Sequence, residues 1–95
     1  MNVFSGTLNA SATQQQFYSG ENLLFRTAYF YAYKSLNGGI GQANTSGLWF
    51  GPESGVMPNY LSPSGSLVIN LPNRDSIANY YFYGASGDGL VAVTY

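Results

Sequence analysis

Short segments rich in aromatic and β-branched residues recur along the chain, and glycines and prolines separate them at fairly regular intervals. Within several segments apolar residues alternate with polar ones, which is the period that side chains follow along a β-strand. The sequence therefore predicts one all-β domain over residues 1–95, a jelly-roll-like antiparallel β-sandwich of about seven strands. The expected strands are Val3–Ala10, Gln14–Tyr18, Leu23–Lys34, Leu48–Phe50, Ser66–Leu71, Asn79–Tyr83 and Leu90–Tyr95, the last two paired as a hairpin around residues 84–89.

The segment Leu23–Lys34 is the richest in apolar residues, and both of its alternating faces are partly apolar. A helix is the competing interpretation, but the clustering of tyrosine and phenylalanine within Tyr29–Tyr33 favours a strand. The odd-numbered residues form a continuous apolar and aromatic face, so we expect them to face the core. The even-numbered face carries an apolar patch between Arg26 and Lys34, a form typical of interaction sites. We therefore expect a subunit interface here, made of Ala28, Phe30 and Ala32 with Tyr31 and Tyr33.

Alternation also assigns a buried face to the last expected strand. Val91, Val93 and Tyr95 share one side of it, and we expect the core to use that side. The intervening residues 36–46 and 53–65 are rich in glycine, proline or polar residues and are predicted to be loops. The predicted core includes Phe25, Tyr29, Trp49, Val68, Leu71, Val91 and Val93.

Charged residues make up only 7% of the chain, against roughly 25% in an ordinary globular domain. With a net charge of −1 there is no basic patch to neutralise phosphates, so nucleic acid is not an expected partner. The longest apolar run, Ala28–Tyr33, is too short to span a membrane, and the start of the chain lacks the features of a signal peptide. So few charges indicate a surface covered by partners or coated in uncharged polar side chains.

Groups suited to catalysis are scarce. The chain has no cysteine and no histidine, which excludes a disulfide framework, a soft-metal site and the commonest general base. Glu21 and Glu53 could be imagined as a carboxylate pair, but solvated or turn-forming roles are the expected ones for all four acidic residues. We therefore predict no enzymatic activity, no catalytic residue, no cofactor and no metal. The four acidic residues are Glu21, Glu53, Asp75 and Asp88.

Aromatic residues are more numerous than a core of this size needs, since 17% of the chain is phenylalanine, tryptophan or tyrosine. Two interpretations of Trp49 stay open. It is either the central core residue, or an exposed ring that forms a binding platform with Tyr60 or Tyr80. Such a platform would stack against a sugar or act as the hot spot of a protein interface.

Three motifs follow one another in the second half of the chain, at Gly47–Gly51 (GLWFG), Tyr60–Ser66 (YLSPSGS) and Ile77–Val93. The first resembles the "tiyvG" strand of a widespread class of small bacteriophage structural proteins, and the second is similar to the "pLaPGeS" turn of that class, which a strand like Leu67–Leu71 follows. The ending Ile77–Val93 resembles its "lyvyGtaGDgVsV" hairpin. The resemblance covers residues 47–95, and its motifs describe turns and strands, so they specify shape better than role.

The resemblance implies a β-sandwich carried on a virion as a head decoration, head-fibre base or tail-associated protein. We expect a capsid decoration or cement subunit that is assembled into the virion from the host cytoplasm. Its expected partners are further copies of itself and the major capsid protein or another virion protein. A homotrimer is preferred because capsid shells offer threefold positions. The alternatives are a carbohydrate- or receptor-binding domain at a fibre or tail tip, with a glycan as partner, and a self-assembling extracellular matrix or fibre protein.

Overall fold

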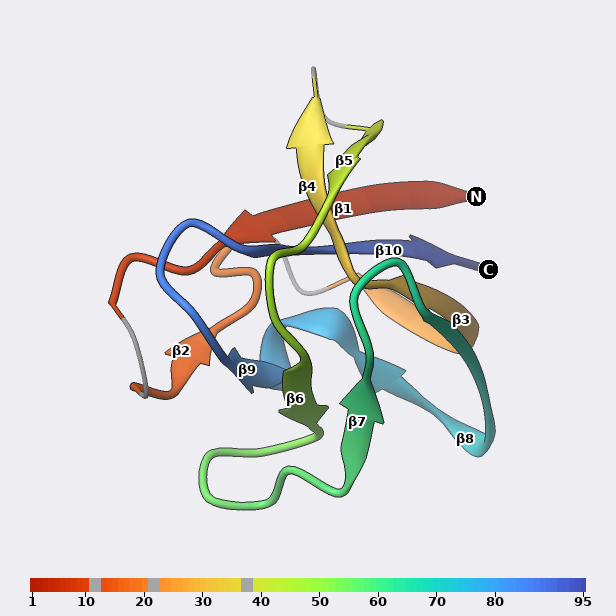
Figure 1. Cartoon of the computed structure of the whole chain (residues 1–95). Coiled ribbons are helices and arrows are strands. Elements are labelled where there is room, and N and C mark those ends of the chain that lie inside the picture. Colours follow the sequence, from red (N-terminus) through yellow and green to blue (C-terminus); the bar gives the residue numbers. More distant parts are fainter. Residues whose placement is uncertain (11–12, 21–22, 37–38) are drawn as a thin grey trace.

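The computed structural model of the chain describes residues 1–10, 13–20, 23–36 and 39–95 (Figure 1). These residues form two four-stranded antiparallel sheets that face each other as a β-sandwich, together with a separate two-stranded hairpin. The one helical element within the described ranges is a 3₁₀ turn, η1 (Ile77–Asn79). The predicted all-β antiparallel sandwich is therefore confirmed, although the described residues form ten strands rather than seven.

Sheet A contains the first and the last strand of the chain. Its strands, in spatial order, are β1 (Asn2–Thr7), β10 (Gly89–Thr94), β3 (Leu24–Tyr31) and β8 (Ser66–Ser76). Because β1 runs antiparallel to β10, with Asn2 opposite Thr94, the two ends of the chain lie side by side (Figure 1). β3 lies between β10 and β8, so it is an interior strand of this sheet.

Sheet B has shorter strands, and one further hairpin pairs with neither sheet. The strands of sheet B, in spatial order, are β2 (Gln15–Gln16), β9 (Tyr81–Tyr83), β6 (Leu48–Gly51) and β7 (Asn59–Leu61). β4 (Tyr33–Leu36) follows β3 directly and pairs with β5 (Gly39–Ala43), and this hairpin contacts β1 and β10 (Figure 1). The residues expected to be a loop over 36–46 thus contain a strand, and β7 likewise lies within the expected loop over 53–65.

The two strands expected to form the last hairpin belong to different sheets. β9 pairs with β2 and β6, whereas β10 pairs with β1 and β3. The chain therefore crosses from one layer to the other over residues 84–88, and the predicted hairpin is wrong. Nearness in sequence suggested that the two strands pair directly with each other. In the structure each of them instead pairs with two other strands of its own sheet, and the apolar faces of β9 and β10 meet across the core.

Aromatic rings from both sheets fill the space between the layers. Phe30 of β3 lies against Phe50 of β6, with ring centroids 4.4 Å apart, and Phe17 contacts Phe30 and Phe82 edge-on. All six phenylalanines of the chain are buried, whereas Tyr80 is the only one of the nine tyrosines classed as buried. A phenol hydroxyl costs free energy when it is removed from water without a partner, so tyrosine favours the outer faces. The buried phenylalanines are Phe4, Phe17, Phe25, Phe30, Phe50 and Phe82.

The core face of β3 is the opposite of the expected one. Ala28, Phe30 and Ala32 are all 0% exposed and belong to the core, so they cannot form the subunit interface predicted for them. Tyr29 lies on the outer face and is 41% exposed. Phe25 is nevertheless buried, because a bulge between Phe25 and Thr27 shifts the register. Before the bulge the odd-numbered Phe25 faces the core, and after it the even-numbered residues do.

Several residues of the predicted core are consequently on outer faces. Trp49 and Val68 are exposed, and Val93 is half-buried on the side of β10 away from sheet B. Val91 is fully buried but stands outside the main core cluster, on the same outer side of β10. Among the predicted core residues, Phe25 lies in the cluster and Leu71 packs partly buried against it.

β8 continues past the proline that was expected to end it. Asn70 pairs with Thr27 and Asp75 pairs with Phe25, so the residues between Asn70 and Asp75 bulge out opposite Arg26. Pro72 falls within this bulge, where its missing N–H removes no bond from the ladder.

Candidate functional site

An exposed pair of aromatic rings lies on the outer face of sheet B. Trp49 of β6 and Tyr60 of β7 are directly opposite each other, with ring centroids 4.9 Å apart and planes at 55°. They are 39% and 51% exposed. A side chain at position 47 would overlap the Tyr60 ring, so Gly47 provides the space in which that ring lies. The pair is part of the folded surface and needs no rearrangement to form.

Two further tyrosines extend this pair across the sheet. Tyr83 of β9 is opposite Trp49 on its other side, which makes a row of three aromatic residues over three strands. Tyr81 lies two residues from Tyr83 and shares its face, because side chains alternate along a strand. Both tyrosines are half-buried. We call Tyr60, Trp49 and Tyr83 the aromatic row.

The platform expected from the sequence is thus only partly correct. Trp49 and Tyr60 come together as expected, but Tyr80 is 2% exposed and belongs to the core, where its ring contacts Phe25 and Phe30. Sequence reasoning missed Tyr81 and Tyr83. The alternation of Tyr81, Phe82 and Tyr83 was the available signal, since the phenylalanine marks the inner face and the two tyrosines the outer one.

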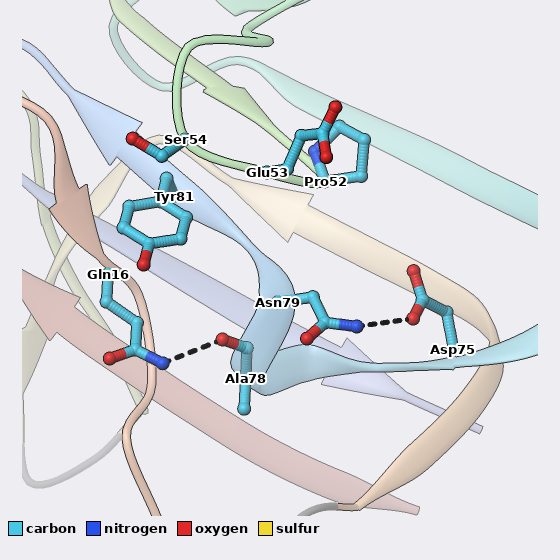
Figure 2. A pocket seen from close by; sticks show the side chains of 8 residues that line it. All are labelled: Gln16, Pro52, Glu53, Ser54, Asp75, Ala78, Asn79 and Tyr81. Atoms are coloured by element: carbon cyan, nitrogen blue, oxygen red, sulfur yellow. Dashed lines mark hydrogen bonds between the residues drawn. The ribbon is translucent and has the colours of Figure 1, made fainter.

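A polar groove of about 800 Å³ adjoins Tyr81 (Figure 2). Its volume falls within the range typical of small-molecule sites, roughly 300–1,000 Å³. The groove is open to solvent and presents amide, hydroxyl and carboxylate groups, with no basic side chain among the described residues that line it. The lining residues are Gln16, Pro52, Glu53, Ser54, Asp75, Ala78, Asn79 and Tyr81.

Hydrogen bonds fix two walls of the groove. On one side, the Gln14 side-chain oxygen accepts from the Ser54 hydroxyl at 3.1 Å and from the Gly55 N–H at 2.7 Å. On the other side, the Asn79 amide donates to Asp75 at 2.7 Å and the Gln16 amide donates to the Ala78 carbonyl at 2.8 Å (Figure 2). The loop on the first side folds over Gly51, where any side chain would overlap the Val56 carbonyl.

One phenol lies buried beside the groove, between the lining residues Asn79 and Tyr81 in sequence. Burial raises the pKa of Tyr80 to about 12, and the negative charge of Asp75 adds to the rise. This tyrosine therefore stays protonated at neutral pH, and its ring packs in the core.

Two of the acidic residues, Glu53 and Asp75, line the groove. Asp88 does not line it and is 1% exposed, so of the two roles expected for it, solvated or turn-forming, the solvated one is wrong. Its two carboxylate oxygens accept from the N–H and hydroxyl of Thr45 and from the N–H of Ser46, at 2.9, 2.9 and 3.0 Å. Glu21 lies outside the described residues.

The outer face of sheet A is a second candidate surface. Val3, Val93, Tyr29 and Val68 are directly opposite one another and form one row across all four strands. Three of the four are exposed, and the exposed Tyr95 ring contacts Tyr29 edge-on. The next row also contains uncharged residues, with Tyr31 half-buried among them; its members are Ser5, Val91, Tyr31 and Ser66.

Among the residues that the structure describes, no group of three or more acidic side chains could hold a metal ion. Within those residues there is also no helix whose length and apolarity would allow it to cross a membrane. No family model, curated protein or solved structure matches the chain. Its function is therefore inferred from its two outer faces and the groove.

Proposed function

We propose that this protein is a non-catalytic structural subunit that self-associates through the outer face of sheet A. The observation that carries the proposal is the apolar row of Val3, Val93, Tyr29 and Val68, which extends across the whole sheet and of which all but the half-buried Val93 are exposed. Contiguous exposed apolar surface of this kind marks interaction sites in soluble proteins.

A second copy of the chain is the occupant that this face fits. The two paired rows carry no charged side chain, so two copies can meet without like-charge repulsion and without desolvating an unpaired charge. Interface cores are depleted in charge and enriched in tyrosine, and this face has both properties. Tyr31 keeps the interface role expected for it, at a half-buried position beside the apolar row. Tyr33 lies half-buried on β4, a strand that contacts β10.

The setting that we propose is a bacteriophage virion, where the subunit is a capsid decoration or cement protein docked on the coat-protein shell. The likeness of residues 47–95 to small phage structural proteins supports this, together with a β-sandwich that has few charges. The preferred assembly is a trimer on a threefold position of the shell. A coat-protein or portal gene beside this one in the source genome is the expected finding, and a neighbourhood of metabolic genes would contradict the virion setting.

Self-association is tested by light scattering after gel filtration. The wild-type chain should be an oligomer of discrete mass, and Tyr29→Asp should reduce it to the monomer mass because a carboxylate is placed in the apolar row. Tyr60→Asp is the matched control, since it places the same charge on an exposed tyrosine of the other sheet and should keep the oligomer. A monomeric wild type, or a Tyr29→Asp chain of unchanged mass, would contradict the proposal.

A further inference from the structure

A second binding surface lies on the opposite side of the sandwich and does not depend on the proposed self-association. It combines the aromatic row with the polar groove, and the two are continuous. Tyr83 belongs to the row and Tyr81 to the groove, on the same face of β9 and about 6.6 Å apart along the strand. A ligand that lies along this face would therefore contact both.

The shape of the row favours a ligand with flat apolar faces. It crosses three strands, which is a span of about 10 Å at the usual spacing between neighbouring strands. The Trp49 and Tyr60 rings are exposed side by side, at an angle of 55°. An exposed aromatic pair with an indole N–H and a phenol hydroxyl at its edges suits a ligand that is apolar on its faces and polar around its rim.

The polar and acidic groups of the groove narrow the choice of ligand class. Glu53 and Asp75 would repel a phosphate or another anion, and no basic side chain among the described lining residues could offset them. An aliphatic ligand would leave the amides and hydroxyls of the groove without partners, which is costly. A neutral ligand with many hydroxyl groups can donate to the carboxylates, to the Gln16 amide oxygen and to the Ser54 oxygen, whose own proton goes to Gln14, and it can accept from the Tyr81 hydroxyl.

We propose that the aromatic row and the adjoining groove together form a binding site for a neutral glycan, in which sugar rings stack on Trp49 and Tyr60 and their hydroxyls bond groove residues. The site is preformed on this surface, because Gly47 leaves room for the Tyr60 ring and Gln14 fixes the groove wall at Ser54 and Gly55. A preformed site binds without an added cost of ordering.

Trp49 is the only tryptophan in the chain, so its fluorescence reports directly on the site. The full chain is titrated with maltohexaose, cellohexaose, mannohexaose, xylohexaose and chitohexaose. At least one of them should change the Trp49 emission saturably, with a dissociation constant between about 0.1 and 1 mM, the range of a shallow site with few contacts. If none of the five changes the emission or binds by calorimetry up to about 10 mM, the proposal is overturned.

Variants locate the binding by calorimetry with the best sugar of the panel. Trp49→Ala should weaken it at least about tenfold and Glu53→Ala about threefold, since the first removes a stacking face and the second a hydrogen-bond acceptor. Tyr95→Ala is the matched control, an exposed aromatic residue on the other sheet, and should leave the affinity unchanged. Circular dichroism confirms that each variant is folded. Unchanged binding by Trp49→Ala overturns the proposal, and unchanged binding by Glu53→Ala overturns the part of it that includes the groove.

The sugar-binding experiment can be distinguished from the test of self-association. Tyr29→Asp should bind the same sugar as the wild type, because its substitution lies on sheet A. A chain that oligomerises but binds no sugar would keep the proposed function and remove the glycan site, and a monomer that binds sugar would do the reverse.

Discussion

Asn44 holds Gly89 through both ends of its side-chain amide. Its Nδ2 donates to the Gly89 carbonyl at 2.8 Å, and its Oδ1 accepts from the Gly89 N–H at 2.9 Å. Both residues are buried, and Gly89 begins β10. The amide of Asn44 therefore replaces a neighbouring strand at the point where the chain enters sheet A from sheet B.

Asn44→Ala should destabilise the protein by about 2–4 kcal/mol, because it leaves a buried N–H and a buried carbonyl without partners. Urea unfolding followed by circular dichroism measures this loss. Asn73→Ala, at an exposed position of the β8 bulge, is the control and should change stability by no more than about 0.5 kcal/mol. A loss of less than about 1 kcal/mol for Asn44→Ala would show that water can replace the amide.

Asp88→Asn should destabilise the protein by about 1–3 kcal/mol despite its near-identical size. Both carboxylate oxygens accept hydrogen bonds, so either orientation of the new amide points its NH₂ at a donor from Thr45 or Ser46. Thermal unfolding should show a melting temperature lower by about 4–8 °C for each kcal/mol lost. A variant that melts with the wild type at pH 7 would contradict the role assigned to Asp88.

Phe30→Ala and Tyr29→Ala should differ sharply although the two residues are adjacent. Phe30 is 0% exposed between Phe50 and Tyr80, so its removal leaves a cavity and should cost about 3–5 kcal/mol. Tyr29 is on the outer face, and its removal should cost the monomer less than about 1.5 kcal/mol. Chemical denaturation at low protein concentration measures both. Equal losses would mean that the core face of β3 is wrongly assigned.

Tyr80 should make the protein sensitive to alkaline pH. Its pKa is raised from 10.0 to about 12 by burial and by Asp75, so the folded state favours the protonated phenol. The stability from this group is fully present below pH 10 and is lost as the pH rises to about 12, at up to roughly 1.4 kcal/mol per pH unit. Urea unfolding of the wild type and Tyr80→Phe between pH 9 and 12 isolates this effect from the other tyrosines. Parallel pH profiles for the two proteins would refute it.

The sequence by itself determined the fold class, because short alternating segments between turn residues leave few other ways to bury the apolar side chains. Residue type also determined which aromatic residues are inside, with Tyr80 as the exception among the tyrosines. The buried set contains every phenylalanine, and eight of the nine tyrosines remain at least partly exposed. The reason is local, since a phenol hydroxyl needs water or a partner wherever the chain places it.

Which face of β3 is buried was decided by the tertiary structure. Both faces of the segment are apolar, so alternation alone could not choose between Phe30 and Tyr29. The choice follows from Phe50 and Tyr80, which pack against Phe30 from elsewhere in the chain. The bulge at Arg26 then placed Phe25 on the same side as Phe30, which no uninterrupted period of two predicts.

The candidate site was also predicted in part from the sequence and in part decided by the tertiary structure. The sequence supplied Trp49 and Tyr60 as an aromatic pair, and residue type was enough to suggest it. The tertiary structure replaced Tyr80 with Tyr83 and placed Tyr81 beside the groove, because β9 pairs with β6 and not with β10. Strand pairing between distant segments depends on how all the apolar faces are buried together, and that is a property of the whole chain and not of any one segment.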